Sequence, residues 1–186
     1  TPYYNKPNQR GMFEHFKAIN DSVVIPQILY NVPCRTGVDI DNKTVKDLSE
    51  LKNIIGIKDA TGEMDRLDEL KNKVSKEFLF LSGDDTTFLD YMKHGGTGVI
   101  SVTANIRPDL MNNACDKMLD QKYEDAEEIN KKLEPLHRAM FVESNPIPVK
   151  WLLGYLGKIN SKIRLPLVTL DEKYHQELVD AYEATL

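Results

Sequence analysis

The sequence predicts an α/β fold with a parallel sheet, followed by a region of helices alone. Four short apolar runs alternate with segments of helical period, and this order indicates βαβ units with right-handed crossovers. The runs lack a clean apolar–polar alternation, which is typical of strands buried on both faces of a parallel sheet. After Val102 no further run of this kind appears, so the rest of the chain is expected to be helical.

Each element can be placed in chain order from these patterns. Asp41 or Asn42 is a candidate N-cap for the helix at Thr44–Leu51, since both side chains accept hydrogen bonds from the first turn. The expected strands are Pro26–Val32, Asn53–Ala60, Glu77–Gly83 and Thr97–Thr103. The expected helices are Met12–Ile19, Thr44–Leu51, Met64–Val74, Thr86–Gly96, Pro108–Leu119, Tyr123–Phe141, Pro146–Leu156 and Asp171–Leu186.

The residues alone leave two architectures open. A complete (β/α)8 barrel needs about 200–250 residues, whereas this chain has 186. An open doubly wound sheet suits that length, but the Gly-rich phosphate loop that often accompanies such a sheet is absent.

Composition excludes several classes of function. The formal net charge is −5, which argues against binding nucleic acid. No apolar run approaches the ~20 residues of a membrane span. The only two cysteines, Cys34 and Cys115, and the scattered histidines suit a reducing cytoplasm and predict neither a disulfide framework nor a metal site. The chain begins Thr1-Pro2-Tyr3 without Met or a signal peptide, so we expect it to be a fragment of a longer protein.

Lys58 points most directly to chemistry. It follows an apolar run at the carboxyl end of an expected parallel strand, the edge where α/β proteins place catalytic groups. Desolvation by apolar neighbours disfavours the ammonium form and lowers the pKa of a lysine. The neutral amine can then attack a carbonyl and form a Schiff base. The alternative is an ordinary lysine that extends from the strand end into solvent.

Further polar residues lie near the ends of the first two expected strands and at the N-terminus. Tyr30 ends the strand before that of Lys58, where its hydroxyl can relay protons; the alternative is a core tyrosine bonded to backbone. Arg35 follows on a loop, where a guanidinium can bind a substrate carboxylate or simply be solvated. Tyr3 and Tyr4 form an aromatic pair on a turn, which indicates an interface, a ligand lid or packing under the loop.

Two acidic residues follow the third expected strand. Asp84 and Asp85 stand directly before Thr86, at the start of an expected helix. We interpret them first as helix caps rather than as catalytic carboxylates.

Six strings, in order, closely resemble one family: TPYYNKP, ILYNVPCRTG, NIIGIKDATG, LSGDD, GVISVTAN and NPIPVKW. The chain is similar along essentially its whole length to the dihydrodipicolinate synthase family of class I pyruvate aldolases, which includes N-acetylneuraminate lyase. The resemblance implies a (β/α)8 TIM barrel followed by a C-terminal helical domain. Residues 1–106 would be the second half of that barrel, from the end of strand 4 to strand 8, and residues 107–186 the last barrel helix and the helical domain.

The resemblance also implies catalytic roles. Lys58 is expected to form the Schiff base with pyruvate, and Tyr30 to relay protons. Tyr4 is expected to relay protons in the active site of a neighbouring subunit. A Gly-Thr-Thr motif, which completes the family's proton relay, is expected to precede Thr1 and is not in this chain.

Binding roles follow from the same resemblance. Arg35 is expected to bind the carboxylate of the second substrate, aspartate semialdehyde, while backbone groups of Gly83 and Ile100 line the pocket. Tyr3 is expected at the interface of a dimer, close to where lysine binds in feedback-inhibited members. No metal or other cofactor is expected.

The implied activity is that of a cytoplasmic, homodimeric or homotetrameric lyase of lysine and diaminopimelate biosynthesis. It condenses pyruvate with aspartate semialdehyde to give 4-hydroxy-tetrahydrodipicolinate. Two alternatives stay open: another pyruvate aldolase, such as N-acetylneuraminate or 2-keto-3-deoxy-sugar-acid lyase, and a non-catalytic α/β binding protein. We expect this chain by itself to be inactive and unstable, because half a barrel leaves strand edges unpaired.

Overall fold

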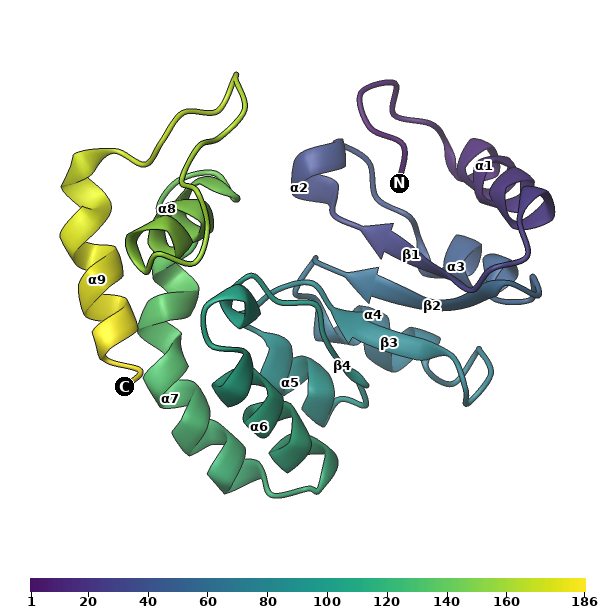
Figure 1. Cartoon of the computed structure of the whole chain (residues 1–186). Helices are drawn as coiled ribbons and strands as arrows, with labels where there is room; N and C mark the ends of the chain where they lie inside the picture. Colours follow the sequence, from purple (N-terminus) through teal and green to yellow (C-terminus); the bar gives the residue numbers. More distant parts are fainter. The chain divides into compact units, whose positions relative to one another are not determined.

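The computed structural model describes all 186 residues as two compact units, Thr1–Ile100 and Ser101–Leu186. The first unit contains a four-stranded parallel sheet in the order β1-β2-β3-β4 (Figure 1). Its strands are β1 Gln27–Asn31, β2 Ile54–Asp59, β3 Leu79–Ser82 and β4 Gly98–Val99. The predicted parallel sheet is therefore confirmed, with each strand inside its expected range.

The sequential strand order decides between the two architectures. In a doubly wound sheet the order reverses, so helices cover both faces, whereas same-sense right-handed crossovers place the helices on one face. Here α1, α3, α4 and α5 all contribute to one core on a single face of the sheet, as a barrel segment requires (Figure 1). The helices of this unit are α1 Gln9–Ser22, α2 Pro33–Thr36, α3 Asn42–Leu48, α4 Met64–Leu70 and α5 Phe88–Lys93.

The two faces of the sheet differ in burial. On the back face, which meets the helices, Leu29, Ile57 and Phe80 are register partners and belong to the core. On the front face, Ile28 and Tyr30 are 40% and 39% exposed. In this chain the front-face side chains of β1 are therefore only partly buried, because the crossovers supply helices to one face only.

Local signals explain the ends of the helices. Asp41 is the N-cap of α3, and its Oδ1 accepts a hydrogen bond from the Thr44 amide at 2.7 Å, as predicted. The chain leaves α5 through Gly95, whose φ of +107° lies in the left-handed region that glycine tolerates. The one-turn helix α2 was not predicted. It begins at Pro33, whose ring suits a first helical turn, and ends at Gly37 in the left-handed conformation.

The second unit is helical, as predicted. Its helices are α6 Pro108–Leu119, α7 Tyr123–Ala139, α8 Ile147–Tyr155 and α9 His175–Glu183, with 3₁₀ turns at Thr103–Asn105 and Glu172–Tyr174. Their apolar faces share one core, which includes Leu136, Leu152 and Leu178. Arg107 ties the end of the chain back to this unit by donating to Thr185 Oγ1 at 2.7 Å. None of the helices combines the length and the apolar character needed to cross a membrane.

Candidate active site

The structure brings Lys58 and Tyr30 together at the carboxyl ends of β2 and β1. The two residues are register partners on neighbouring parallel strands, so their side chains project from the same face. The Lys58 Nζ lies 4.2 Å from the centre of the Tyr30 ring. The side chain of Lys58 therefore does not extend freely into solvent but lies against an aromatic ring.

Burial disfavours the charged forms of both groups. Desolvation lowers the pKa of the Lys58 amine, and the carboxylate of Asp85 opposes that shift. Desolvation also raises the pKa of the Tyr30 phenol, against the effect of the positive charge of Arg35. A lysine with a lowered pKa is more often a neutral nucleophile, and a protonated phenol beside it can donate a proton.

Gly83 sets how closely β3 approaches Lys58. A Cβ atom at this position would lie 3.0 Å from Lys58 Cε and 2.8 Å from Ala60 Cβ, so only glycine leaves the space that the lysine stem occupies. The Gly83 amide donates to the Asp59 carbonyl at 2.7 Å, and the Ile100 amide donates to the Ser82 carbonyl at 2.9 Å. Both residues lie at the same sheet edge as Lys58.

Arg35 lies on α2, directly after β1. Its side chain is exposed, and its positive charge opposes the rise in the pKa of the Tyr30 phenol. The turn that carries it is fixed by Thr36, whose Oγ1 donates to the Val38 carbonyl at 2.8 Å. A cation held beside the pair can attract a carboxylate.

The tyrosine pair follows the N-terminus, where the Thr1 ammonium donates to the Tyr30 carbonyl at 2.8 Å. Tyr3 and Tyr4 are 75% and 89% exposed, and no hydrogen bond joins either of them to Lys58 or Tyr30. Tyr4 and Lys6 have φ values of +68° and +45°, a conformation that residues other than glycine rarely adopt. Such strain is typical of functional loops.

The two acidic residues after β3 behave differently. Asp84 Oδ2 accepts hydrogen bonds from the hydroxyls of Thr86 and Thr87, both at 2.7 Å, and so fixes the approach to α5 through side chains. Asp85 is 2% exposed and its charge reaches Lys58. The interpretation of Asp84 and Asp85 as helix caps is wrong, because the N-cap of α5 is Thr87, whose own side chain makes no capping hydrogen bond. The available signal for Asp85 was its position three residues after the end of β3.

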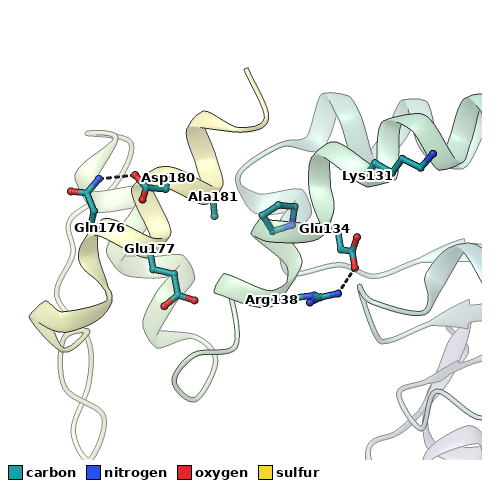
Figure 2. A pocket seen from close by; sticks show the side chains of 8 residues that line it. Lys131, Glu134, Arg138, Gln176, Glu177, Asp180 and Ala181 are labelled. Atoms are coloured by element: carbon teal, nitrogen blue, oxygen red, sulfur yellow. Dashed lines mark hydrogen bonds and ion pairs between the residues drawn. The ribbon is translucent and has the colours of Figure 1, made fainter.

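A hollow that is separate from Lys58 and Tyr30 lies in the helical unit, between α7 and α9 (Figure 2). Arg138 pairs with Glu134, and Gln176 donates to Asp180 at 2.7 Å, so these side chains engage neighbours on their own helices. The lining residues are Lys131, Glu134, Pro135, Arg138, Gln176, Glu177, Asp180 and Ala181. The hollow holds no nucleophile beside a base, and no group of three or more His, Cys, Asp or Glu anywhere in the chain could hold a metal ion.

Known proteins share this sequence and fold. The family model described as "Dihydrodipicolinate synthetase family" matches residues 1–185. A 4-hydroxy-tetrahydrodipicolinate synthase of Buchnera aphidicola is 53% identical over 174 residues, which are 93% of this chain and 59% of that protein.

Two solved structures superpose closely. Dihydrodipicolinate synthase of Acinetobacter baumannii, complexed with pyruvate, is 47% identical with a TM-score of 0.96 and covers 100% of this chain and 64% of its own. The enzyme of Cyanidioschyzon merolae with lysine bound is 34% identical, with a TM-score of 0.96. The match covers 99% of this chain and 63% of that one. This chain thus spans less than two thirds of the length of these relatives. The match along the whole chain shows that it belongs to the dihydrodipicolinate synthetase family.

Proposed function

We propose that this chain carries the Schiff-base lysine of a 4-hydroxy-tetrahydrodipicolinate synthase, a lyase that joins pyruvate to aspartate semialdehyde. One observation carries the proposal: the Lys58 amine lies 4.2 Å from the centre of the Tyr30 ring, at the strand ends where barrels hold their active sites. The lowered pKa of Lys58 and the names of the relatives support it.

The proposed reaction begins with the neutral Lys58 amine. It attacks the keto carbon of pyruvate, and loss of water from the carbinolamine gives an imine. Loss of a methyl proton gives an enamine, whose carbon attacks the aldehyde of the semialdehyde. The amino group of the semialdehyde then displaces Lys58 as the ring closes. Tyr30 relays protons, together with Tyr4 from a neighbouring subunit.

Arg35 is proposed to select the second substrate. Its exposed guanidinium follows directly after β1 on α2, and it can hold a carboxylate through two hydrogen bonds. Backbone groups of Gly83 and Ile100 line the same edge. A short substrate that ends in a carboxylate suits a cation there better than a sugar acid, which needs hydroxyl partners.

The assembly and its control are also proposals. Tyr4 is exposed and held in a strained backbone, which suits a side chain that completes the site of a neighbouring subunit in a homodimer or homotetramer. Tyr3 is exposed beside it, and we place the binding of lysine as a feedback inhibitor near this residue. We place the activity in the cytoplasm.

Trapping the imine tests the proposal. The complete protein, that is, this chain with any residues its gene encodes before Thr1, is incubated with pyruvate and then with borohydride. We expect a reduced pyruvate adduct on the peptide that contains Lys58, and none in Lys58→Arg. Absence of any adduct would contradict the proposal and favour a non-catalytic binding protein.

The second substrate is tested by Arg35→Ala. We expect the same pyruvate adduct but a kcat/KM for aspartate semialdehyde lower by about 10- to 100-fold, the typical effect of losing a charge-assisted contact. Lys122→Ala, which removes an exposed cation of the helical unit, is the control. Cleavage of N-acetylneuraminate by the unsubstituted protein would instead identify a sugar-acid lyase.

A further inference from the structure

Behind the Lys58–Tyr30 pair lies a second set of polar residues that the proposed reaction does not use. Asn31 follows Tyr30 and Asp59 follows Lys58, and these two are register partners on the opposite face of the sheet. They are 0% and 7% exposed. With Asp39 and Arg66 they form what we call the back-face cluster.

Asn31 is the centre of this cluster. Its Nδ2 donates to Asp39 Oδ1 at 2.7 Å and to Asp59 Oδ1 at 3.3 Å. Its Oδ1 accepts from the Ile40 amide at 3.3 Å. One amide side chain therefore joins the end of β1 to the end of β2 and to the loop before α3.

Arg66 joins the same segments from α4. Its Nη1 lies 2.7 Å from Asp39 Oδ2, its Nη2 donates to the Ile40 carbonyl at 2.6 Å, and its Nε lies 3.5 Å from Asp59 Oδ2. The side chain is 17% exposed, so these contacts are largely shielded from water. A planar guanidinium with fixed donors holds its partners in one geometry, which a flexible ammonium does not.

Asp59 also accepts hydrogen bonds from the turn that follows its own strand. Thr61 donates to it from both its amide, at 3.2 Å, and its hydroxyl, at 3.0 Å. Burying such ions is expensive, and an apolar core of the same shape is often equally stable. The retention of a charged cluster here is therefore better explained by the single geometry it enforces than by stability alone.

Lys58 and Asp59 are consecutive residues of one strand and point to opposite faces. Rotation of the strand end that released Asp59 would swing Lys58 away from Tyr30. On the front face, Gly83 leaves only enough room for the lysine stem. The lysine is thus confined by packing in front and by the cluster behind.

We propose that Asp59 and Arg66 are positioning residues: they fix the ends of β1 and β2 so that the Lys58 amine stays beside the Tyr30 ring, partly withdrawn from water. The inference rests on the proposed function and deepens it. Neither residue touches the substrate; both act through the strand ends.

The test is the pH dependence of pyruvate adduct formation in the complete protein with Asp59→Asn. If the cluster positions Lys58, the variant forms the borohydride-trapped adduct about 10- to 100-fold more slowly at pH 7, as expected for a small misplacement of a reacting group. The apparent pKa that controls adduct formation moves up toward that of an ordinary lysine, so raising the pH restores part of the rate. Asp59→Glu keeps the negative charge, so we expect its rate of adduct formation to fall less than that of Asp59→Asn.

Val45→Ala is the control for stability alone. Val45 lies in α3 and is fully buried on the same side of the sheet. Its apolar side chain makes no hydrogen bond to the back-face cluster. We expect this variant to lower the Tm while leaving the apparent pKa of adduct formation unchanged. An equal shift in Val45→Ala, or an unchanged rate and pH profile in Asp59→Asn, would overturn the inference.

Arg66→Lys decides the question if Asp59→Asn does not fold. It keeps the charge but loses the planar donors, and the same upward shift of the apparent pKa is expected. No shift in Arg66→Lys overturns the inference. Failure of the unsubstituted protein to form any adduct rejects the proposed function itself, which is a distinct outcome.

Discussion

The front and back faces of the ends of β1 and β2 hold their polar side chains in different ways. On the front face, Lys58 lies against Tyr30 with its pKa lowered by burial, and Ile28, two residues before Tyr30 on β1, is 40% exposed. On the back face, Asn31 and Asp59 are buried and engaged by several hydrogen bonds and an ion pair.

The difference distinguishes a group that can react from groups that hold the strand ends in place. A partly desolvated amine without a close ion-pair partner is reactive but does not stabilise the fold. A buried cluster in which each carboxylate meets donors holds its surroundings in one arrangement. Adjacent residues of one strand, Lys58 and Asp59, therefore have opposite roles, because successive side chains point to opposite faces.

Lys58→Met removes the amine on the front face, and we expect it to have the largest effect on turnover. Loss of the nucleophile should reduce turnover by more than about 1,000-fold. The same variant should be more stable at pH 7, because the lowered pKa means that the unfolded chain binds this proton more tightly. The stability gap should narrow as the pH rises through the lowered pKa toward 10.5. Turnover and thermal unfolding at pH 7 and pH 10 measure both effects, and a destabilised variant at pH 7 would contradict the second.

Arg66→Met breaks the supporting side. It leaves the carboxylates of Asp39 and Asp59 without their shared cation, and we expect the free energy of unfolding to fall by about 3 kcal/mol, at the low end for breaking a buried pair. Asp39 is 42% exposed, so water compensates in part. Urea unfolding measures the loss. Lys43→Met, which breaks the exposed pair with Asp47, should change stability far less, because water screens that pair.

Gly83→Ala tests the packing between the faces. The added Cβ would lie 2.8 Å from Ala60 Cβ and 3.0 Å from Lys58 Cε, so the lysine stem must shift. Overpacking of this kind typically costs about 1–3 kcal/mol, and we expect slower adduct formation with pyruvate as well. Gly11→Ala is the matched control, since its nearest neighbour would be at 3.4 Å. Equal adduct rates in both variants would show that Gly83 does not confine Lys58.

The ionisation of Asp59 should give the smallest effect on stability, and its pH dependence should be visible only in acid. Burial raises its pKa above the usual 3.8, against the charge of Arg66, so the folded chain binds this proton more tightly than the unfolded chain. The contribution is fully present below pH 3.8 and is lost as the pH rises through the raised pKa. As the pH rises from 3.8 through the raised pKa of Asp59, the stability of Asp59→Asn relative to the unsubstituted protein should therefore rise. A falling difference in urea unfolding would show that the pKa is lowered instead.

Much of the fold could be predicted from local patterns. The apolar runs that became β1 to β4 and the helical stripes that became α6 to α8 were each found near their final bounds, because a short continuous apolar run or a period of 3.6 residues is visible within a short window. Lys58 and Tyr30 were identified for the same reason, since each ends such a run. The sequence did not indicate α2, whose single turn is too short to show a period.

The back-face cluster could not be predicted in this way. Arg66 meets Asp39 across 27 positions of the chain, and Asn31 meets Asp59 across 28. No periodicity links residues at such separations. The only available signal was that a polar residue follows both Tyr30 and Lys58 at the strand ends, which places Asn31 and Asp59 on the opposite face.

The sequence by itself determined the order of strands and helices, the family, and the presence of a lysine and a tyrosine at two neighbouring strand ends. Only the tertiary structure decided that all four strands lie in sequential order, that one face is left half-exposed, and that distant charges meet behind Lys58. The pattern of apolar residues in one segment reflects the geometry of that helix or strand alone. How strands pair depends on their register and on the direction of the crossovers between them, and no single segment determines these.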